Sequence, residues 1–242
     1  MKIQSTRNVA DDLGIKCLVY GASGVGKTTL CATAPKPLIL AAENGLLSIR
    51  KFAIDYVAIT SINELLGILD ELASNTDYET ICLDSVSEIV DHCLFGIERK
   101  LKSRDARHVY PEVRSIVLHI LKKLIALPQH IIVTCKQQHK EVADQQTVTC
   151  PAVAGTRLSN DLAYMFDMVF YLRVVNKQRY IIANAGENFV AKDRTNLLTA
   201  PVLVGNNFFV SLISKFKTGV TSNGQGKGRS VEGLSDAHPE DI

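Results

Sequence analysis

Eight residues near the start of the chain have the composition and spacing of a phosphate-binding loop. Residues 21–28, GASGVGKT, match the pattern G-x-x-x-x-G-K-[ST]. The glycines permit a tight turn in which successive backbone N–H groups point inward and form a nest for an anion. In such a loop the lysine reaches the β- and γ-phosphates of a nucleotide, and the final hydroxyl binds Mg²⁺. The alternative is a glycine-rich turn that matches the pattern by chance.

We therefore expect ATP and Mg²⁺ as ligands of this loop. Lys27 is the predicted catalytic cation, and Thr28 is a predicted ligand of the metal. The predicted nucleotide-binding residues are Gly21, Ala22, Ser23, Gly24, Val25, Gly26, Lys27, Thr28 and Thr29.

Two acidic residues are candidates for completing the site. Asp84 closes the apolar run 80–84, and a carboxylate at the end of a neighbouring strand commonly anchors the Mg²⁺ of such loops; a helix cap is the alternative role. Hydrolysis also needs a group that activates water, and the residue after Asp84 is Ser85 rather than a glutamate. Glu43, just past the apolar run 37–42, is the candidate base, and an ordinary loop carboxylate is the alternative.

The elements that must position these residues follow from the hydrophobic pattern. Near-continuous apolar runs alternate with amphipathic segments, which predicts an α/β fold: a mostly parallel sheet with helices on both faces. The last two runs are close enough to predict an antiparallel hairpin that turns near residues 175–177. The predicted strands are 15–20, 37–42, 56–59, 80–84, 130–135, 168–174 and 178–184. The predicted helices are 61–73, one that begins near residue 85, and one from about residue 112 to Pro128.

Composition is that of a globular protein with one large core. The chain has 242 residues, 46% of them hydrophobic and 21% charged, with a net charge of +2, so bulk charge indicates no particular class of partner. We predict one domain over residues 1–217 and a disordered Gly/Ser-rich tail with an acidic tip over 218–242. The six cysteines lack C-x-x-C spacing and are expected to be buried thiols. Because no segment has the length of a signal peptide core or a membrane span, we expect no membrane association and a cytoplasmic location.

Three stretches together resemble the RecA-type ATPase core. They are GASGVGKTT, LILAAENGL and TICLDSVSEI, and the similarity covers roughly residues 15–195. In that family the catalytic glutamate follows the strand after the loop helix, and the metal aspartate is followed by serine. Within the class, the compact size and the APKPLIL connection are most similar to phage-encoded AAA-type nucleotide-binding proteins, which include RecA-core single-strand annealing proteins.

The resemblance implies further site residues. In IIVTCKQQ, Gln137, or alternatively Gln138, occupies the place of a glutamine that senses the γ-phosphate. In AKDR, Lys192 and Arg194 match a K-x-R pair that reaches the neighbouring subunit's γ-phosphate, so a homo-oligomer is expected; a solvated basic turn is the alternative. An isolated chain would lack such a trans-acting cation, which can accelerate phosphoryl transfer strongly.

A basic cluster suggests contact with single-stranded DNA. It occupies the place of the family's first DNA loop, and such a cluster could neutralise phosphates, although a solvated helix end is an equally simple explanation. The candidate residues are Arg99, Lys100, Lys102, Arg104 and Arg107, with His108 and Tyr110 as possible stacking partners. The second candidate loop, 139–157, has no aromatic residue, and its acidic residues offset its basic ones, which argues against conventional strand exchange.

Three functions are compatible with these residues. The first is a Mg-dependent ATPase that acts on single-stranded DNA in phage-type recombination, annealing or replication. The second is a nucleotide-switched loading module that recruits a partner such as a single-strand binding protein. The third, a small-molecule kinase, would require a lid with convergent arginines, and residues 157–184 contain no such arginine cluster.

Overall fold

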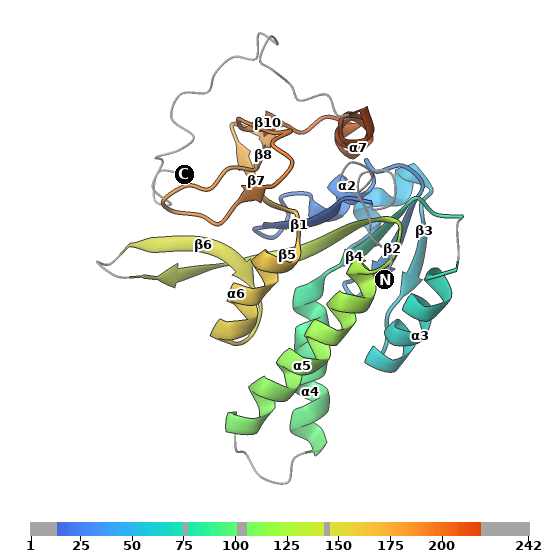
Figure 1. The fold of residues 1–242 in the computed structure, drawn as a ribbon, viewed down its shortest axis with the longest axis vertical. Helices are drawn as coiled ribbons and strands as arrows, with labels where there is room; N and C mark the ends of the chain where they lie inside the picture. The colour runs from blue at the N-terminus through green and yellow to red at the C-terminus, as the bar shows by residue number, and fades with distance from the viewer. Residues whose placement is uncertain (1–13, 75–76, 101–105, 143–145, 219–242) are drawn as a thin grey trace, which may run out of the picture.

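The computed structural model describes residues 14–74, 77–100, 106–142 and 146–218. Strands and helices alternate along most of this length (Figure 1). The strands are β1 (Lys16–Gly21), β2 (Pro37–Ala41), β3 (Asp55–Ala58), β4 (Thr80–Asp84), β5 (His130–Glu141), β6 (Thr147–Ala152), β7 (Met168–Val175), β8 (Gln178–Ile182), β9 (Lys192–Asp193) and β10 (Val202–Leu203). The helices are α2 (Lys27–Cys31), the 3-10 helix η2 (Leu46–Phe52), α3 (Ile62–Leu72), α4 (Val86–Lys100), α5 (Ala106–Ile125), α6 (Thr156–Met165) and α7 (Phe208–Thr218).

All strands belong to one mixed sheet with the order β10-β8-β7-β1-β5-β4-β2-β3. The neighbours from β7 to β3 along this order are parallel, whereas β8 and β10 extend the sheet in antiparallel fashion. β6 pairs with β5 and β9 with β7, both antiparallel. Because β5 pairs in parallel with both β1 and β4, the carboxyl ends of these three strands meet at one edge of the sheet. We call this the carboxyl edge, and the opposite one the amino edge.

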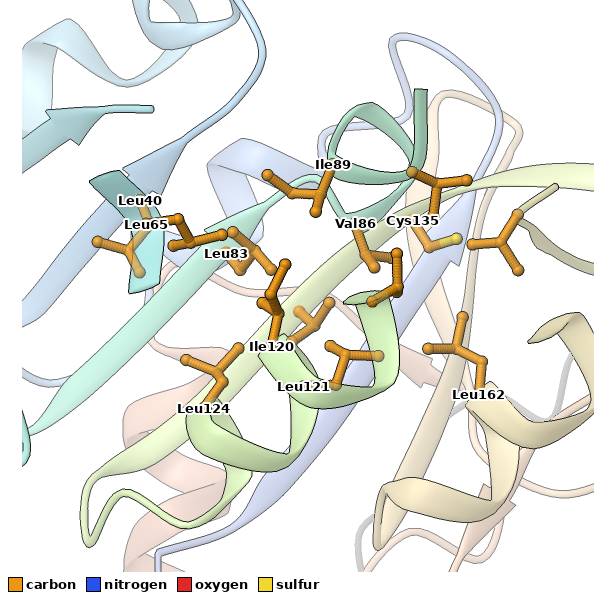
Figure 2. Close-up of a cluster of buried hydrophobic side chains, with 14 of the residues drawn as sticks. Leu40, Leu65, Leu83, Val86, Ile89, Ile120, Leu121, Leu124, Cys135 and Leu162 are labelled. Atoms are coloured by element: carbon orange, nitrogen blue, oxygen red, sulfur yellow. The ribbon is translucent and has the colours of Figure 1, made fainter. Parts of the chain in front are cut away.

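Both faces of the sheet are covered, as the near-continuous apolar strands predict. Along β1, Leu18 and Tyr20 point into one core, and Cys17 and Val19 point into the other. Helices α3, α4, α5 and α6 pack on the first face, where Leu83 lies among leucine and isoleucine side chains from α3, α4 and α5 (Figure 2). Helices α2 and α7 pack on the second face. The predicted α/β class is therefore confirmed.

The N-terminal ends of two helices agree closely with the sequence. The hydroxyl of Ser61 caps α3 by accepting the backbone N–H of Glu64 at 3.2 Å. The carboxylate of Glu64 accepts the N–H of Thr60 at 2.9 Å, one residue earlier than the standard capping box. Helix α4 begins at Val86, directly after Ser85, near which the sequence places its start.

Other boundaries differ from the sequence prediction. Helix α5 starts at Ala106 rather than near residue 112. The stretch before Pro111 contains too few apolar residues to show the helical hydrophobic period, so the sequence did not predict this first part of the helix. The predicted loop 139–157 is largely β-hairpin: β5 continues to Glu141 and returns as β6. In Figure 1 this hairpin extends sideways beyond the helices, which explains why its strands lack an apolar run. The predicted domain boundary falls at the end of α7, and residues 219–242 lie outside the described part of the chain.

The amino edge is closed by buried polar groups. Lys16 donates from Nζ to the carbonyl oxygens of Leu127 at 2.6 Å and Gln129 at 2.7 Å, just after α5. His130 accepts the backbone N–H of Ile15 at 3.0 Å through Nδ1. Burial lowers the pKa of Lys16 to about 8, against a smaller opposing effect of Asp167, and burial also lowers the pKa of His130 to about 4. All six cysteines are free and buried, as expected.

Candidate nucleotide-binding site

The loop between β1 and α2 has the geometry that its glycines predict. Gly24 and Gly26 adopt φ angles of 75° and 96°, which side chains with a Cβ rarely adopt. Gly21 requires the absence of a side chain for another reason, since a Cβ there would lie 2.4 Å from the carbonyl oxygen of Leu172 on β7. Gly26 is the N-cap of α2, so the loop leads directly into the helix that carries Lys27 and Thr28. The chain therefore presents backbone N–H groups and two functional side chains at the carboxyl edge.

Lys27 lies across the mouth of the loop. Its Nζ donates to the carbonyl oxygens of Gly21 at 3.0 Å and Ala22 at 2.8 Å. Burial lowers the pKa of Lys27 below its ordinary value of 10.5, while the negative charges of Glu43 and Asp84 act in the opposite direction. The ammonium group is thus desolvated and held close to both acidic candidates.

Asp84 connects the loop to the neighbouring strands. The Thr28 hydroxyl donates to its Oδ2 at 2.6 Å, and the Thr134 hydroxyl at the centre of β5 donates to its other oxygen. The carboxylate group is buried, with 3% of Asp84 exposed. Thr134 was not predicted from the sequence, because its contact with Asp84 depends on the pairing of β5 with β4.

Glu43 lies beside Asp84, at the end of the adjacent strand. The backbone N–H groups of Ala42 and Glu43 both donate to the carbonyl oxygen of Asp84, at 2.8 and 3.1 Å. The Ser85 hydroxyl donates to the Glu43 carboxylate. Ser85, which follows Asp84 where many such ATPases have a glutamate, therefore orients Glu43, which follows β2. The structure thus brings Lys27, Thr28, Asp84 and Glu43 together.

These residues fit a Mg²⁺ bound together with phosphates. Mg²⁺ prefers oxygen ligands and is commonly held by one or two protein groups plus phosphates and water. Thr28 and Asp84 supply a hydroxyl and a carboxylate in contact with each other. Among the described residues no group of three or more His, Cys, Asp or Glu side chains could hold a metal by itself, which is compatible with a metal that arrives with its nucleotide.

Lys136 is a second cation near this site that was not predicted. It follows the last buried residue of β5 and pairs in register with Gly21. Its Nζ forms an ion pair with Glu88 and lies 3.8 Å from Asp91, both on α4. The positive charge of Lys136 contributes to lowering the pKa of Lys27. The pKa of Lys136 is itself raised, mainly by its hydrogen bond to Glu88 and to a smaller extent by the charge of Glu43. Lys136 therefore connects the nucleotide site electrostatically to α4.

The predicted glutamines lie farther along the hairpin. Gln137 pairs in register with Pro151 on β6, and no hydrogen bond of its side chain is seen within the described residues. Gln138 donates from Nε2 to the Pro151 carbonyl at 2.9 Å and to the Ser159 hydroxyl at 3.3 Å, so it joins the hairpin to α6. The γ-phosphate-sensing role of Gln137 stays a prediction, and Lys136 is the residue of this segment nearest the site by register and charge.

Lys192 and Arg194 lie at the amino edge, at the ends of the strands opposite the phosphate loop. β9 pairs with Met168 and Val169 at the start of β7, which is parallel to β1. Lys192 donates to the carbonyl oxygen of Ala163 at 2.6 Å, and Arg194 pairs with Asp167 at 3.4 Å. Within the chain both residues bind the end of α6, at the strand ends opposite the phosphate loop.

The basic cluster falls mostly outside what the structure describes. Arg99 is exposed on α4 with its guanidinium carbon 5.6 Å from the centre of the Phe95 ring. Lys102 and Arg104 lie outside the described residues, as do the side chains of Lys100, Arg107 and His108. Tyr110 is 48% exposed in the first part of α5.

The fold and the site define a P-loop nucleotide-binding protein. Residues 13–195 match the family model described as an AAA domain (AAA_24), and the chain belongs to this family of P-loop ATPases. No curated protein matches the chain by sequence. Among solved structures it is similar to the KaiC-like protein PH0186 from the hyperthermophilic archaeon Pyrococcus horikoshii OT3, with 14% identity, a TM-score of 0.48, and coverage of 81% of this chain and 88% of that one. Within the described residues, no helix combines the length and the apolar character needed to cross a membrane.

Proposed function

We propose that the protein hydrolyses Mg·ATP, with Glu43 as the base that activates water. The observation that carries this proposal is the chain of contacts from Thr28 through Asp84 to Glu43 at the carboxyl edge. Thr28 and Asp84 would hold the metal ion, Lys27 binds the terminal phosphates, and Glu43 accepts a proton from the attacking water. When bound, the ion would neutralise charge on the phosphates and orient them.

We propose that the ATPase acts on single-stranded DNA, in phage-type recombination, annealing or replication. Support comes from the resemblance to RecA-type cores, from exposed Arg99 and Tyr110, and from the basic residues between them in sequence. Lys192 and Arg194 are proposed to act on the neighbour's nucleotide in a homo-oligomer. Their place at the amino edge supports this, because a head-to-tail contact would bring one protomer's amino edge to the next one's carboxyl edge.

The Glu43→Gln variant tests the assignment of the base. We expect ATP binding to be retained and turnover to fall by at least about a hundredfold, because the amide cannot accept the proton. Turnover is measured with and without single-stranded DNA, binding by calorimetry, and mass in solution by light scattering. Asp70→Asn is the matched control, since Asp70 is an acidic residue on α3 that pairs with Lys123 on α5 and has no proposed role in turnover. Unchanged turnover in Glu43→Gln would refute the assignment.

A nucleotide-switched loading module is the second candidate, and Lys136 is the observation that favours it. Its ion pairs with Glu88 and Asp91 give α4 a direct link to the phosphate site. In this case ATP binding alone would recruit a partner such as a single-strand binding protein. Recruitment by the Glu43→Gln variant with ATP, equal to that by the wild type, would support the loading module over an obligatory hydrolysis cycle.

A further inference from the structure

Arg179 contacts the phosphate loop from the side opposite the acidic residues. It lies on β8, just after the tight β7–β8 turn in which Asn176 and Lys177 have φ angles of 50° and 62°. Its Nε donates to the carbonyl oxygen of Val25 at 2.8 Å. A Cβ at Gly26 would lie 2.6 Å from this Nε and 3.1 Å from the guanidinium carbon, so the group rests directly against the loop backbone.

The strand order places Arg179 and the metal residues on different sides of β1. Asp84 and Glu43 come from β4 and β2, which lie beyond β5, whereas β8 lies beyond β7 on the other side. A triphosphate in the loop must have its terminal phosphate near Lys27, Thr28 and Asp84. Its other end, which carries the ribose and base, then extends toward the β7–β8 hairpin.

We propose that Arg179 forms one wall of the nucleoside subsite, with its guanidinium packed against the base of the bound nucleotide. This inference rests on the proposed binding of ATP and assigns a second, separate part of that site. Among the nitrogens of the Arg179 guanidinium, only Nε has a hydrogen-bond partner within the described residues, and the residue is exposed. A planar, weakly hydrated guanidinium stacks well on aromatic rings, which a lysine ammonium in the same place does not reproduce.

A bracing role for the loop is the competing explanation, and it makes a different prediction. A brace that only holds the Val25 carbonyl would affect every ligand of the loop equally. A wall of the nucleoside subsite would affect only ligands that carry a nucleoside. The comparison of nucleotides with inorganic triphosphate therefore separates the two.

The experiment compares Arg179→Ala with the wild type by calorimetry, using Mg·ATP, Mg·ADP and inorganic triphosphate. We expect ATP and ADP binding to weaken about tenfold, while triphosphate binding changes by less than about twofold. Where triphosphate binds too weakly to titrate, its inhibition of ATP turnover gives the same comparison. Lys177→Gln, which removes a positive charge from the same hairpin, is the matched control and should leave all three ligands unaffected.

Three results would overturn the proposal. They are equal weakening of nucleotides and triphosphate, no weakening of nucleotides, and full recovery of ATP binding by Arg179→Lys, which restores charge without the planar group. A wild-type protein that binds neither ATP nor triphosphate would instead refute the proposed function itself. Thermal unfolding of each variant verifies that the loop change leaves the fold intact.

Discussion

At the scale of single residues, the site depends on hydroxyl groups as much as on charged ones. Asp84 is buried, and both of its oxygens accept hydrogen bonds, from Thr28 and Thr134, so neither oxygen is left without a donor. Ser85 performs the same task for Glu43. Three hydroxyl groups thus fix two acidic side chains: Thr28 on α2 and Thr134 on β5 contact Asp84 on β4, and Ser85 after β4 contacts Glu43 after β2.

Thr134→Val provides a direct test of this support. Valine preserves the volume but leaves one oxygen of Asp84 without a donor, which loosens the orientation of the carboxylate toward the metal. We expect the Mg²⁺ concentration for half-maximal turnover to rise roughly tenfold to a hundredfold.

Thr134→Ser is the matched variant, since it keeps the hydroxyl that donates to Asp84. It should behave nearly as the wild type in the Mg²⁺ dependence of turnover. A purely packing role for Thr134 would be indicated if valine were tolerated and serine were not, because serine lacks the methyl group.

His130 gives a prediction about stability rather than activity. It is 6% exposed, and its pKa is about 4, below the ordinary 6.5, mainly because burial disfavours the charged ring and secondarily because of Lys217 and Lys16. A group whose pKa is lowered on folding is neutral in the folded state, so unfolded chains bind more protons between pH 6.5 and 4. Stability is therefore full above pH 6.5 and lost as the pH falls, by roughly 2 kcal/mol at pH 5 from this residue.

His130→Asn removes the titration and retains an acceptor for the N–H of Ile15. Urea unfolding at pH 7.5 and pH 5 should show a smaller loss of stability in the variant than in the wild type. The comparison uses the slope with pH, so a constant destabilisation of the variant does not affect it. Equal slopes for the two proteins would contradict the assignment of a neutral, buried His130.

At the scale of elements, the hydrophobic pattern predicted the strands that helices cover on both faces and missed the β-hairpin that projects beyond them. The strands β1, β2, β4 and β7 are buried on both faces, and their predicted ranges agree with the structure to within a residue or so. The far half of β5, together with β6, is held by antiparallel pairing and by contacts such as Lys140 to Ser159, which leave no apolar signature. Helices α6 and α7 were not predicted either, although each has a buried apolar face, and β9 and β10 have only two residues each, too few for a pattern.

The candidate site shows the same division. Residues that belong to a local motif, such as Lys27 and Thr28, could be found from spacing alone. Asp84 and Glu43 required only the rule that parallel strands end at one edge. Thr134, Lys136 and Arg179 belong to no local pattern, because their importance arises from strand order and from register with β1. Only the three-dimensional arrangement could identify them.

At the scale of the whole molecule, the two ends of the sheet carry different halves of the proposed hydrolytic site. The carboxyl edge holds the loop with Asp84 and Glu43, and the amino edge holds Lys192 and Arg194. Tyr164, which is 77% exposed, lies beside Arg194, whose Nη2 donates to the Tyr164 carbonyl at 3.3 Å. An exposed aromatic group next to a basic pair suits an interface, since aromatic residues and arginine are enriched there.

A mixing experiment tests whether Arg194 acts on the neighbouring protomer. Glu43→Gln lacks the base but has an intact Arg194, and Arg194→Ala has the opposite defect, so each should be nearly inactive alone. In an equal mixture of a head-to-tail assembly, about a quarter of the interfaces combine an intact Glu43 with an intact Arg194. We therefore expect the mixture to recover up to about a quarter of the wild-type turnover, well above the sum of the two variants.

Arg114→Ala is the matched control, because Arg114 also contacts the α6 segment, through Asp161 at 2.6 Å, but has no proposed role in turnover. If the mixture assembles and its rate equals the sum of its parts, Arg194 does not act across the interface, and its bond to Asp167 is its whole role.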